Sequence, residues 1–258
     1  MRLFKTINMK PELALIIGCS RSGTTITRTV LNYHRQIHIA WETEYSLNFW
    51  RHLENRSKYF EHLIETADRQ IKTQAKLGGY VYDNNQIPLS KPKDLLVVGE
   101  KIWNPSMLLL AGQYNKIAEL ELILQTSVKI INCIRHPQDV VATMCLRNNI
   151  QNEAGISDRL NWLEQHLLAT DSIKQKVYGN QLYDCYHEEL ILNPELTICE
   201  MIKFLGLEPS QINLDLVKNI LFDKPKVTRN SINWSDRSWQ RILDMQQKYR
   251  WLSKYNLD

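Results

Sequence analysis

The sequence lacks long hydrophobic runs and is poor in cysteine. Apolar stretches such as Leu13–Ile17 and Leu108–Ala111 are far shorter than the 18 or more residues that a membrane-spanning helix requires. The five cysteines are widely spaced and include no C-x-x-C pair, so neither a disulfide framework nor a zinc site is expected. These absences argue against a membrane protein. They predict a soluble, cytoplasmic protein whose cysteines are reduced.

The sequence also has little excess of either charge sign. It contains 32 Lys and Arg against 28 Asp and Glu, a net charge of +4. A dedicated nucleic-acid-binding protein usually carries a concentrated basic excess, so nucleic acid is not an expected partner. A local pocket for one small anion remains compatible with this balance. At 43% hydrophobic and 23% charged residues, the composition is that of a globular protein with a sizeable core.

No repeat, low-complexity tract or Pro/Gly-rich linker divides the chain, so we predict a single domain over residues 1–258. Short apolar runs alternate with segments of helical periodicity. Strands are expected at residues 13–17, 95–98 (ended by Gly99), 128–134 and 181–186, and helices at 24–34, 46–76, 137–149, around 160–168, 194–205 and 238–255. Strands separated by helices predict the α/β class, with a central parallel sheet flanked by helices.

The loop Gly18–Thr25 (G-C-S-R-S-G-T-T) lies between a predicted buried strand and a predicted helix. Backbone N–H groups and the positive end of the helix can hold an anion there. The loop matches the phosphate-loop pattern G-x-x-x-x-G-K-[ST], except that Thr24 occupies the lysine position. That lysine reaches the β- and γ-phosphates in nucleotidases, so its absence argues against triphosphate cleavage. In the alternative interpretation, Ser22 and Thr24 merely cap the helix of an ordinary strand–turn–helix joint.

The segments around this loop resemble a known family. Arg21–Thr25 (R-S-G-T-T) is followed, after a predicted helix, by Trp41–Glu44 (W-E-T-E). This combination resembles the 5′-phosphosulfate loop of sulfotransferases, which use 3′-phosphoadenosine 5′-phosphosulfate (PAPS). It is closest to the branch of the tyrosylprotein sulfotransferases and their soluble bacterial relatives.

Two later blocks continue the resemblance in family order. Lys129–Met144 (K-I-I-N-C-I-R-H-P-Q-D-V-V-A-T-M), with Arg147 beyond it, is similar to the family's 3′-phosphate segment. Tyr186–Leu190 (Y-H-E-E-L) resembles the family's Y-E-x-L strand end, with His187 in place of the usual tyrosine. The resemblance implies a P-loop-like α/β fold and PAPS as cofactor.

Carried over residue by residue, the resemblance predicts a cofactor site. The 5′-phosphosulfate would be held by Arg21, Ser22, Gly23, Thr24 and Thr25, and the 3′-phosphate by Arg135, Thr143 and Arg147. Physical reasoning supports the second group, because an arginine at a strand end beside a helix N-terminus lies near amide donors. Thr143 and Arg147 are four residues apart and share one helix face.

Two further interpretations concern this predicted cofactor site. Arg135 could instead, or in addition, form a salt bridge to Asp139. The segment Lys226–Ser231 stands where the family has a loop closing over the cofactor, with Ser231 and Arg229 as its candidates.

Glu42 aligns with the catalytic base of the tyrosylprotein branch. A partly desolvated carboxylate can accept the acceptor proton near neutrality. Glu44, two residues on, would share the same face of an extended segment and is an alternative base. Glu42 could also be an ordinary surface carboxylate.

Lys101 resembles the lysine of the family's K-x-P-type segment and could stabilise charge on the leaving oxygen. Its other interpretations are a pair with Glu100 or a solvated strand end. Trp41 and Trp103, which flank Glu42 and Lys101, could line an acceptor pocket.

These residues predict a sulfotransferase that moves a sulfuryl group from PAPS to a hydroxyl or amine of a small-molecule acceptor by in-line displacement. Residues 46–92 are expected to be a helical insertion that shapes the acceptor pocket. No metal is required. His34 and His38 have the spacing of helical metal ligands but no third ligand, so a surface pair is expected.

Two other functions remain open at this point. A P-loop kinase or NTPase is disfavoured by Thr24 in place of lysine. A non-catalytic nucleotide-binding module is disfavoured because a carboxylate is present at position 42.

Overall fold

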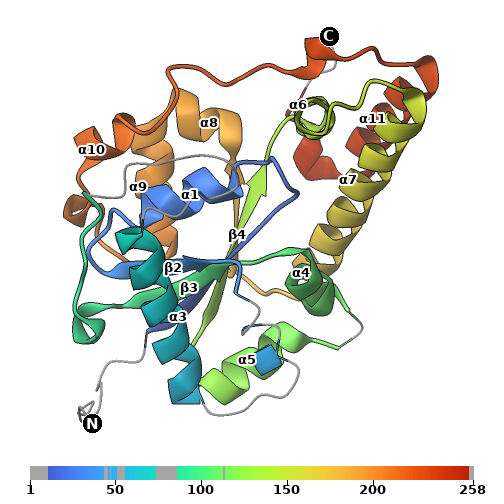
Figure 1. Ribbon diagram of the computed structural model, residues 1–258. Helices are drawn as coiled ribbons and strands as arrows, with labels where there is room; N and C mark the ends of the chain where they lie inside the picture. Colours follow the sequence, from blue (N-terminus) through green and yellow to red (C-terminus); the bar gives the residue numbers. More distant parts are fainter. Residues whose placement is uncertain are drawn as a thin grey trace.

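A five-stranded parallel sheet organises the chain (Figure 1). The computed structural model describes residues 11–43, 46, 48–50, 56–73, 86–112 and 114–255. The strands are β1 (Glu12–Ile17), β2 (Ile37–Trp41), β3 (Val97–Lys101), β4 (Val128–Ile134) and β5 (Leu182–Tyr186), in the order β2-β3-β1-β4-β5. All four neighbouring pairs are parallel, which confirms the α/β class predicted from the sequence.

Helices separate the strands along the chain. They are α1 (Thr24–Leu31), α3 (Arg56–Lys72), α4 (Asn104–Ala111), α5 (Lys116–Leu124), α6 (Pro137–Arg147), α7 (Glu153–Lys174), α8 (His187–Leu192), α9 (Pro194–Phe204), α10 (Leu214–Lys218) and α11 (Asp236–Lys248). Short 3₁₀ helices accompany them in the described residues, namely η1 (Pro92–Asp94), η2 (Pro209–Gln211), η3 (Arg229–Ser231) and η4 (Arg250–Leu252). None of the helices in the described part of the chain is both long and apolar enough to cross a membrane.

Alternate residues of β1 pack into two different cores, because successive strand side chains point to opposite faces of a sheet. Leu13 and Leu15 belong to a core with α3, α4, α5 and α7. Ala14 and Ile16 belong to a core with α1, α8 and α9. In Figure 1, α1, α8 and α9 lie on one side of the strands, with α4 and α5 on the other. Burial on both faces explains why this strand is a continuous apolar run.

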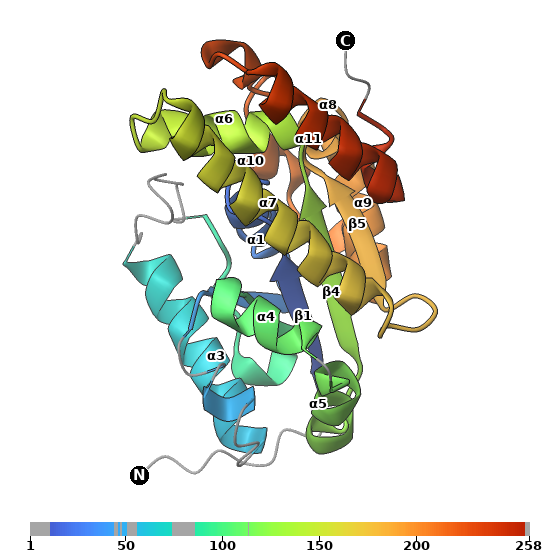
Figure 2. The ribbon, with the colours of Figure 1, turned by 90° about the vertical axis from the view of Figure 1, so that its right-hand side faces the viewer.

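A third core lies beyond the sheet. Val141 of α6, Leu160 of α7 and Ile242 of α11 are buried against one another. Figure 2 shows α6 and α11 beyond the carboxyl end of β4. The segment after α10 therefore returns to the same end of the sheet as the loop that follows β1.

Two differences between the predicted and observed strands bear on the site. β2 was not predicted, because its histidine interrupts an otherwise short apolar run. The third strand along the chain was predicted to end at Gly99, but β3 continues through Glu100 and Lys101. This difference places Lys101 at the last position of β3, opposite Trp41 of β2 and Ile16 of β1.

The prediction that His34 and His38 form a surface pair is wrong. Both side chains are buried. His34 follows α1, and its Nε2 lies 3.1 Å from the carbonyl oxygen of Glu208. His38 is on β2, with its Nε2 3.4 Å from Asp68. Because β2 is a strand, the i, i+4 spacing does not place the two rings on a common helix face.

Gly99 is required by the close packing of β3 against β1. A Cβ atom at position 99 would lie 1.9 Å from the carbonyl oxygen of Ala14, which is a backbone atom that cannot move aside alone. We expect Gly99→Ala to lower the free energy of unfolding by roughly 2–3 kcal/mol, in the range for overpacked cores. Urea denaturation measures this change. Wild-type stability in the variant would contradict the close approach of the two strands.

Candidate active site

The order of the strands brings five sequence segments together at the carboxyl edge of the sheet. The chain leaves β1 toward β2 on one side, and β4 adds on the other side of β1, so the direction reverses between β1 and β4. Open α/β sheets bind ligands at such a point. The loop after β1, Arg135 after β4 and His187 after β5 meet here. Glu42 and Lys101 lie at the ends of the neighbouring pair β2 and β3.

The loop after β1 is tightly folded and leaves the N-terminus of α1 open. Gly18, Arg21 and Gly23 have positive φ angles of 144°, 76° and 97°. The backbone N–H and the hydroxyl of Ser22 both donate to the carbonyl oxygen of Cys19, at 3.0 and 2.7 Å. Gly23 is the N-cap residue of α1, and no side chain accepts a hydrogen bond there. The interpretation of Ser22 and Thr24 as simple caps is therefore not supported.

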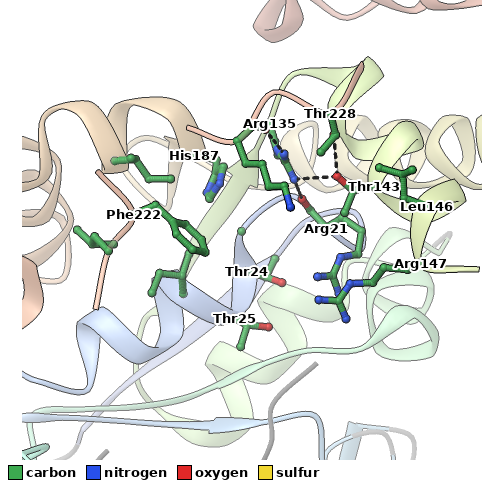
Figure 3. A pocket seen from close by; sticks show the side chains of 15 residues that line it. Arg21, Thr24, Thr25, Arg135, Thr143, Leu146, Arg147, His187, Phe222 and Thr228 are labelled. Carbon is green, nitrogen blue, oxygen red and sulfur yellow. Dashed lines mark hydrogen bonds between the residues drawn. The ribbon is translucent and has the colours of Figure 1, made fainter. Parts of the chain in front are cut away.

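A cleft of about 420 Å³ opens beside this loop. Its polar side chains come from the loop and the start of α1, from the β4–α6 junction, from α8 and from the segment after α10: Arg21, Thr24, Thr25, Arg135, Thr143, Arg147, His187, Lys226 and Thr228. Figure 3 shows Arg21 and Arg147 on one side of the cleft and Phe222 on the opposite side. Four basic residues with no Asp or Glu in the lining suit an anion, and the volume is in the range of small-ligand sites.

Arg135 joins two walls of the cleft. Its Nη1 donates to the carbonyl oxygen of Arg21 at 3.1 Å and to Thr143 Oγ1 at 3.3 Å, and its Nη2 donates to the carbonyl oxygen of Lys226 at 2.7 Å. Asp139, the alternative partner from the sequence, instead forms its salt bridge with Arg229 at 2.7 Å. Arg135 thus lines the cleft and also fixes the loop after β1 against the C-terminal segment.

Asp139 holds the C-terminal segment over α6. Its Oδ1 accepts the backbone N–H groups of Thr228 and Arg229, both at 2.7 Å. The Thr228 hydroxyl lies 2.9 Å from that of Thr143 and contributes to the cleft. Of the two sequence candidates in this segment, Ser231 is exposed on η3 and Arg229 pairs with Asp139. Neither is among the lining residues.

His187 forms part of the cleft floor. A Cβ atom at position 23 would lie 2.5 Å from His187 Nδ1, so only glycine lets the loop pass this close to the ring. Burial, reinforced by the charge of Arg135, lowers the pKa of His187 to about 4. The imidazole is therefore neutral at physiological pH, and the positive charge in the cleft comes from arginine and lysine.

Glu42 and Lys101 form an ion pair between the ends of β2 and β3. The Lys101 side chain is 11% exposed and that of Glu42 is 34% exposed, so the pair is accessible mainly through the carboxylate. Lys101 Nζ also lies 5.8 Å from the centre of the Trp41 ring. Lys101 therefore pairs with Glu42 rather than with Glu100, the partner considered from the sequence. Glu44, the alternative base, lies outside the described residues.

The model of the sulfotransferase family matches residues 14–211, which is more than half of the chain. The chain belongs to the sulfotransferase family. Sulfuryl transfer is therefore its general activity. A sequence comparison with curated proteins finds no match.

Solved sulfotransferases share the fold of this sulfotransferase at low sequence identity. The sulfotransferase domain of the Synechococcus PCC 7002 olefin synthase superposes with a TM-score of 0.57 at 14% identity, covering 100% of both chains. A sulfotransferase from Alicyclobacillus acidocaldarius gives a TM-score of 0.51 at 13% identity, covering 96% of this chain and 97% of that one. A mouse sulfotransferase complexed with PAP gives a TM-score of 0.51 at 10% identity, covering 96% and 89%.

The sulfotransferase brings most of its sequence-predicted residues to two adjoining places. Arg21, Gly23, Thr24, Thr25, Arg135, Thr143 and Arg147 line the cleft. Ser22 does not, because its hydroxyl is directed to Cys19 within the loop. Glu42 and Lys101 meet at the neighbouring strand ends and are not part of the cleft lining. Among the described residues, no three His, Cys, Asp or Glu side chains gather as metal ligands would.

Leu146, Phe222, Lys226 and Thr228 are among the lining residues that the sequence did not single out as site residues. Leu146 lies three residues after Thr143 on α6 and shares a helix face with it, so helical spacing could have indicated it. The other three come from an irregular segment far along the chain. The basic and hydroxyl residues of 226–231 signal that segment, but they do not show which side chain faces the cleft.

Glu100 is an ionisable residue beside the Glu42–Lys101 pair. Its side chain is fully buried. Its carboxylate accepts hydrogen bonds from the backbone N–H of Thr43 and the hydroxyl of Ser46. Burial raises the pKa of Glu100 to about 7, although these two hydrogen bonds oppose the rise. The native protein therefore binds a proton at Glu100 that the unfolded chain, with an ordinary pKa near 4.5, releases.

This raised pKa predicts how stability depends on pH. The native state binds more protons at Glu100 than the unfolded state does. The contribution of Glu100 to stability is therefore full below about pH 4.5 and is lost as pH rises through 7. Glu100→Gln removes this dependence. We expect the variant's free energy of unfolding, relative to wild type, to rise by about 2–3 kcal/mol across that interval. Urea titrations of both proteins at about pH 5 and pH 8 measure it, and a pH-independent difference would contradict the raised pKa.

Proposed function

We propose that this sulfotransferase moves a sulfuryl group from PAPS to a hydroxyl or amine of a small-molecule acceptor. The observation that carries the proposal is the cleft itself. It joins an uncapped helix N-terminus to Arg21, Arg135 and Arg147 at the carboxyl edge of the sheet, where the strand order reverses between β1 and β4. The Glu42–Lys101 pair lies at the ends of the adjoining strands.

The residues of the cleft fit a nucleotide that carries anions at both ends. Residues 21–25 offer backbone N–H groups and hydroxyls at the N-terminus of α1 for the 5′-phosphosulfate. Arg135, Thr143 and Arg147 supply charge and a hydroxyl for the 3′-phosphate. The mouse relative complexed with PAP, adenosine 3′,5′-bisphosphate, supports the same class of ligand here. Thr24 in place of the phosphate-loop lysine favours this ligand over a triphosphate.

The ion pair supplies the two remaining requirements of sulfuryl transfer. When bound, PAPS supplies the sulfuryl group. Glu42 accepts the proton of the acceptor hydroxyl or amine as the new S–O or S–N bond forms. Lys101 places an ammonium group where negative charge grows on the bridging oxygen as the old S–O bond breaks. The products are the sulfated acceptor and PAP, and the proton resides on Glu42 until water removes it.

The surroundings of this pair suggest the kind of acceptor. Trp41 and Trp103 flank the pair and are partly exposed, so their rings favour a hydroxyl or amine carried on an apolar or aromatic body. Helix α3 packs beside β2, where Gln70 accepts the backbone N–H of Trp41 and donates to its carbonyl oxygen, both at 2.8 Å. This part of the proposed insertion, residues 46–92, therefore fixes one of the two aromatic residues.

A screen of acceptors tests the proposal. The protein is incubated with PAPS and a panel of phenols, aliphatic alcohols and amines in EDTA, and products are analysed by mass spectrometry. We expect one acceptor class to gain the mass of one SO₃ group, with an equal amount of PAP released. The matched control, Lys101→Ala, should form far less product. A parallel incubation with ATP and Mg²⁺ tests the kinase alternative. Phosphorylated products there, and none with PAPS, would contradict the proposed function.

A further inference from the structure

The backbone of Glu42 is held in an unfavourable conformation. Its φ angle is 40°, in the left-handed region that non-glycine residues seldom occupy. Such a conformation persists only where surrounding contacts impose it, and it clusters at functional sites. Two contacts from the end of β3 impose it here, one from a backbone group and one from a side chain.

These contacts fix the peptide groups on both sides of the Glu42 Cα. The N–H of Glu42 donates to the carbonyl oxygen of Lys101 at 2.9 Å. The N–H of the next residue, Thr43, donates to the Glu100 carboxylate. With both peptide groups anchored to β3, the direction in which the Glu42 side chain leaves the backbone is set, and it leads to Lys101 Nζ.

The second carboxylate oxygen of Glu100 extends this anchor into the core. It accepts the hydroxyl of Ser46, which lies 2.9 Å from the hydroxyl of Thr43 and 3.4 Å from that of Tyr59 on α3. Tyr59 in turn accepts the Trp50 indole N–H at 3.0 Å. Glu100 therefore ties β3 to Thr43 and Ser46 and, through Tyr59, to α3.

Glu100 cannot itself touch a substrate, because its side chain is fully buried. No basic side chain among the described residues forms an ion pair with it. Burying an unpaired carboxylate is unfavourable, and an apolar side chain would usually fill such a place with less penalty. An apolar residue at this position could not accept the hydrogen bonds that Glu100 accepts from Thr43 and Ser46.

We propose that Glu100 is a positioning residue whose carboxylate holds Thr43 and Ser46, so that the Glu42 carboxylate meets Lys101. This role rests on the proposed function in one respect, since the pair that Glu100 positions is the one assigned to sulfuryl transfer. Glutamine should preserve the role, because its amide oxygen can accept from Thr43 and its amide N–H can donate to Ser46. Leucine, of similar volume, can do neither.

The reactivity of the Lys101 amine tests the positioning directly. Wild type, Glu42→Gln, Glu100→Gln and Glu100→Leu are labelled with a trace of acetic anhydride, beside a standard peptide, and Lys101 acetylation is measured by mass spectrometry. Glu42→Gln gives the reactivity of Lys101 without its carboxylate partner. We expect Lys101 acetylation in Glu100→Leu to rise several-fold toward the Glu42→Gln value. In Glu100→Gln it should remain near the wild-type value. Circular dichroism confirms that each variant is folded.

Two results would overturn the positioning role. Wild-type labelling in Glu100→Leu, when Glu42→Gln raises it, would show that the pair forms without Glu100. No rise in Glu42→Gln would show that there is no pair to position. If Glu100→Leu does not fold, Glu100→Asp replaces it, because the shorter side chain cannot reach both Thr43 and Ser46. The same rise is then expected, and its absence overturns the proposal.

A kinetic readout separates this inference from the function on which it rests. With the acceptor found by screening, Glu100→Leu should lower kcat by about 10- to 100-fold through misplacement of Glu42, with PAP affinity unchanged and most of the rate restored in Glu100→Gln. Wild-type kcat in Glu100→Leu would overturn the positioning role and leave sulfuryl transfer intact. Absence of PAP binding in wild type would overturn the function, while the labelling result would still decide the role of Glu100.

Discussion

Glu42→Gln is expected to lower turnover by about 10²–10⁴-fold, the range for loss of a general base. PAP affinity should hardly change, because Glu42 does not line the cleft. Glutamine keeps the size of the side chain and can still accept a hydrogen bond from Lys101, but it cannot take the acceptor proton. Steady-state kinetics with the screened acceptor give kcat, and calorimetry with PAP gives the binding constant for the same protein.

Glu44→Gln is the matched control for this prediction. It makes the same chemical change two residues away, at a position outside the described residues. Near-normal turnover in Glu42→Gln, combined with a large loss in Glu44→Gln, would transfer the role of base to Glu44. Loss of PAP binding in Glu42→Gln would instead contradict the separation between the ion pair and the cofactor cleft.

Lys101→Ala should lower kcat by about 10²–10³-fold, the effect of removing one group that stabilises developing negative charge. The loss should exceed any change in cofactor binding, because the charge matters most as the leaving oxygen develops. Kinetics at saturating PAPS and calorimetry with PAP separate the two effects. Lys129→Ala, which removes a lysine from β4 within the same sheet, is the matched control and should retain turnover. A defect confined to binding would make Lys101 a cofactor ligand instead.

The double variant tests whether Glu42 and Lys101 act together. If the pair works as a unit, the variant that combines Glu42→Gln with Lys101→Ala should lower kcat by a smaller factor than the product of the two single factors. Losses that multiply fully would indicate independent roles. This comparison requires one variant beyond the two made for the single measurements.

Much of the fold could be predicted because its signals are local. The apolar run of β1 and the glycine that ends it are readable from a few adjacent residues, and so is Pro137 at the start of α6. β2 escaped prediction because His38 interrupts its apolar pattern. The side chain is buried only because α3, a distant segment, brings Asp68 beside it. Gly99 was taken as a strand end, whereas it lies within β3 where only glycine fits against the backbone of β1.

The same distinction applies to the site. Arg21, Arg135 and Thr143 each lie in a short contiguous motif that follows a predicted strand. The sequence alone therefore indicated them. Thr228 and Phe222 depend on how the C-terminal segment returns over α6, and no short-range pattern encodes that path.

Glu100 is the most informative difference between sequence and structure. In the sequence it stood beside Lys101 as a possible ion-pair partner. In the structure, alternation along β3 sends the two side chains to opposite faces, so Lys101 meets Glu42 while Glu100 enters the core. That outcome requires β3 to extend beyond Gly99, which composition alone does not predict.

Calorimetry of nucleotide binding in EDTA tests the central claim of a PAPS-type cleft most directly, since it needs no knowledge of the acceptor. PAP should bind about 10- to 100-fold more tightly than ADP or ATP, because in the proposed site its 3′-phosphate would meet Arg135, Thr143 and Arg147 and each charged hydrogen bond contributes about 1.5–3 kcal/mol. Arg135→Ala should remove most of the preference for PAP over 5′-AMP. ATP binding that requires Mg²⁺, together with indifference to the 3′-phosphate, would contradict the assignment of PAPS as the sulfuryl donor.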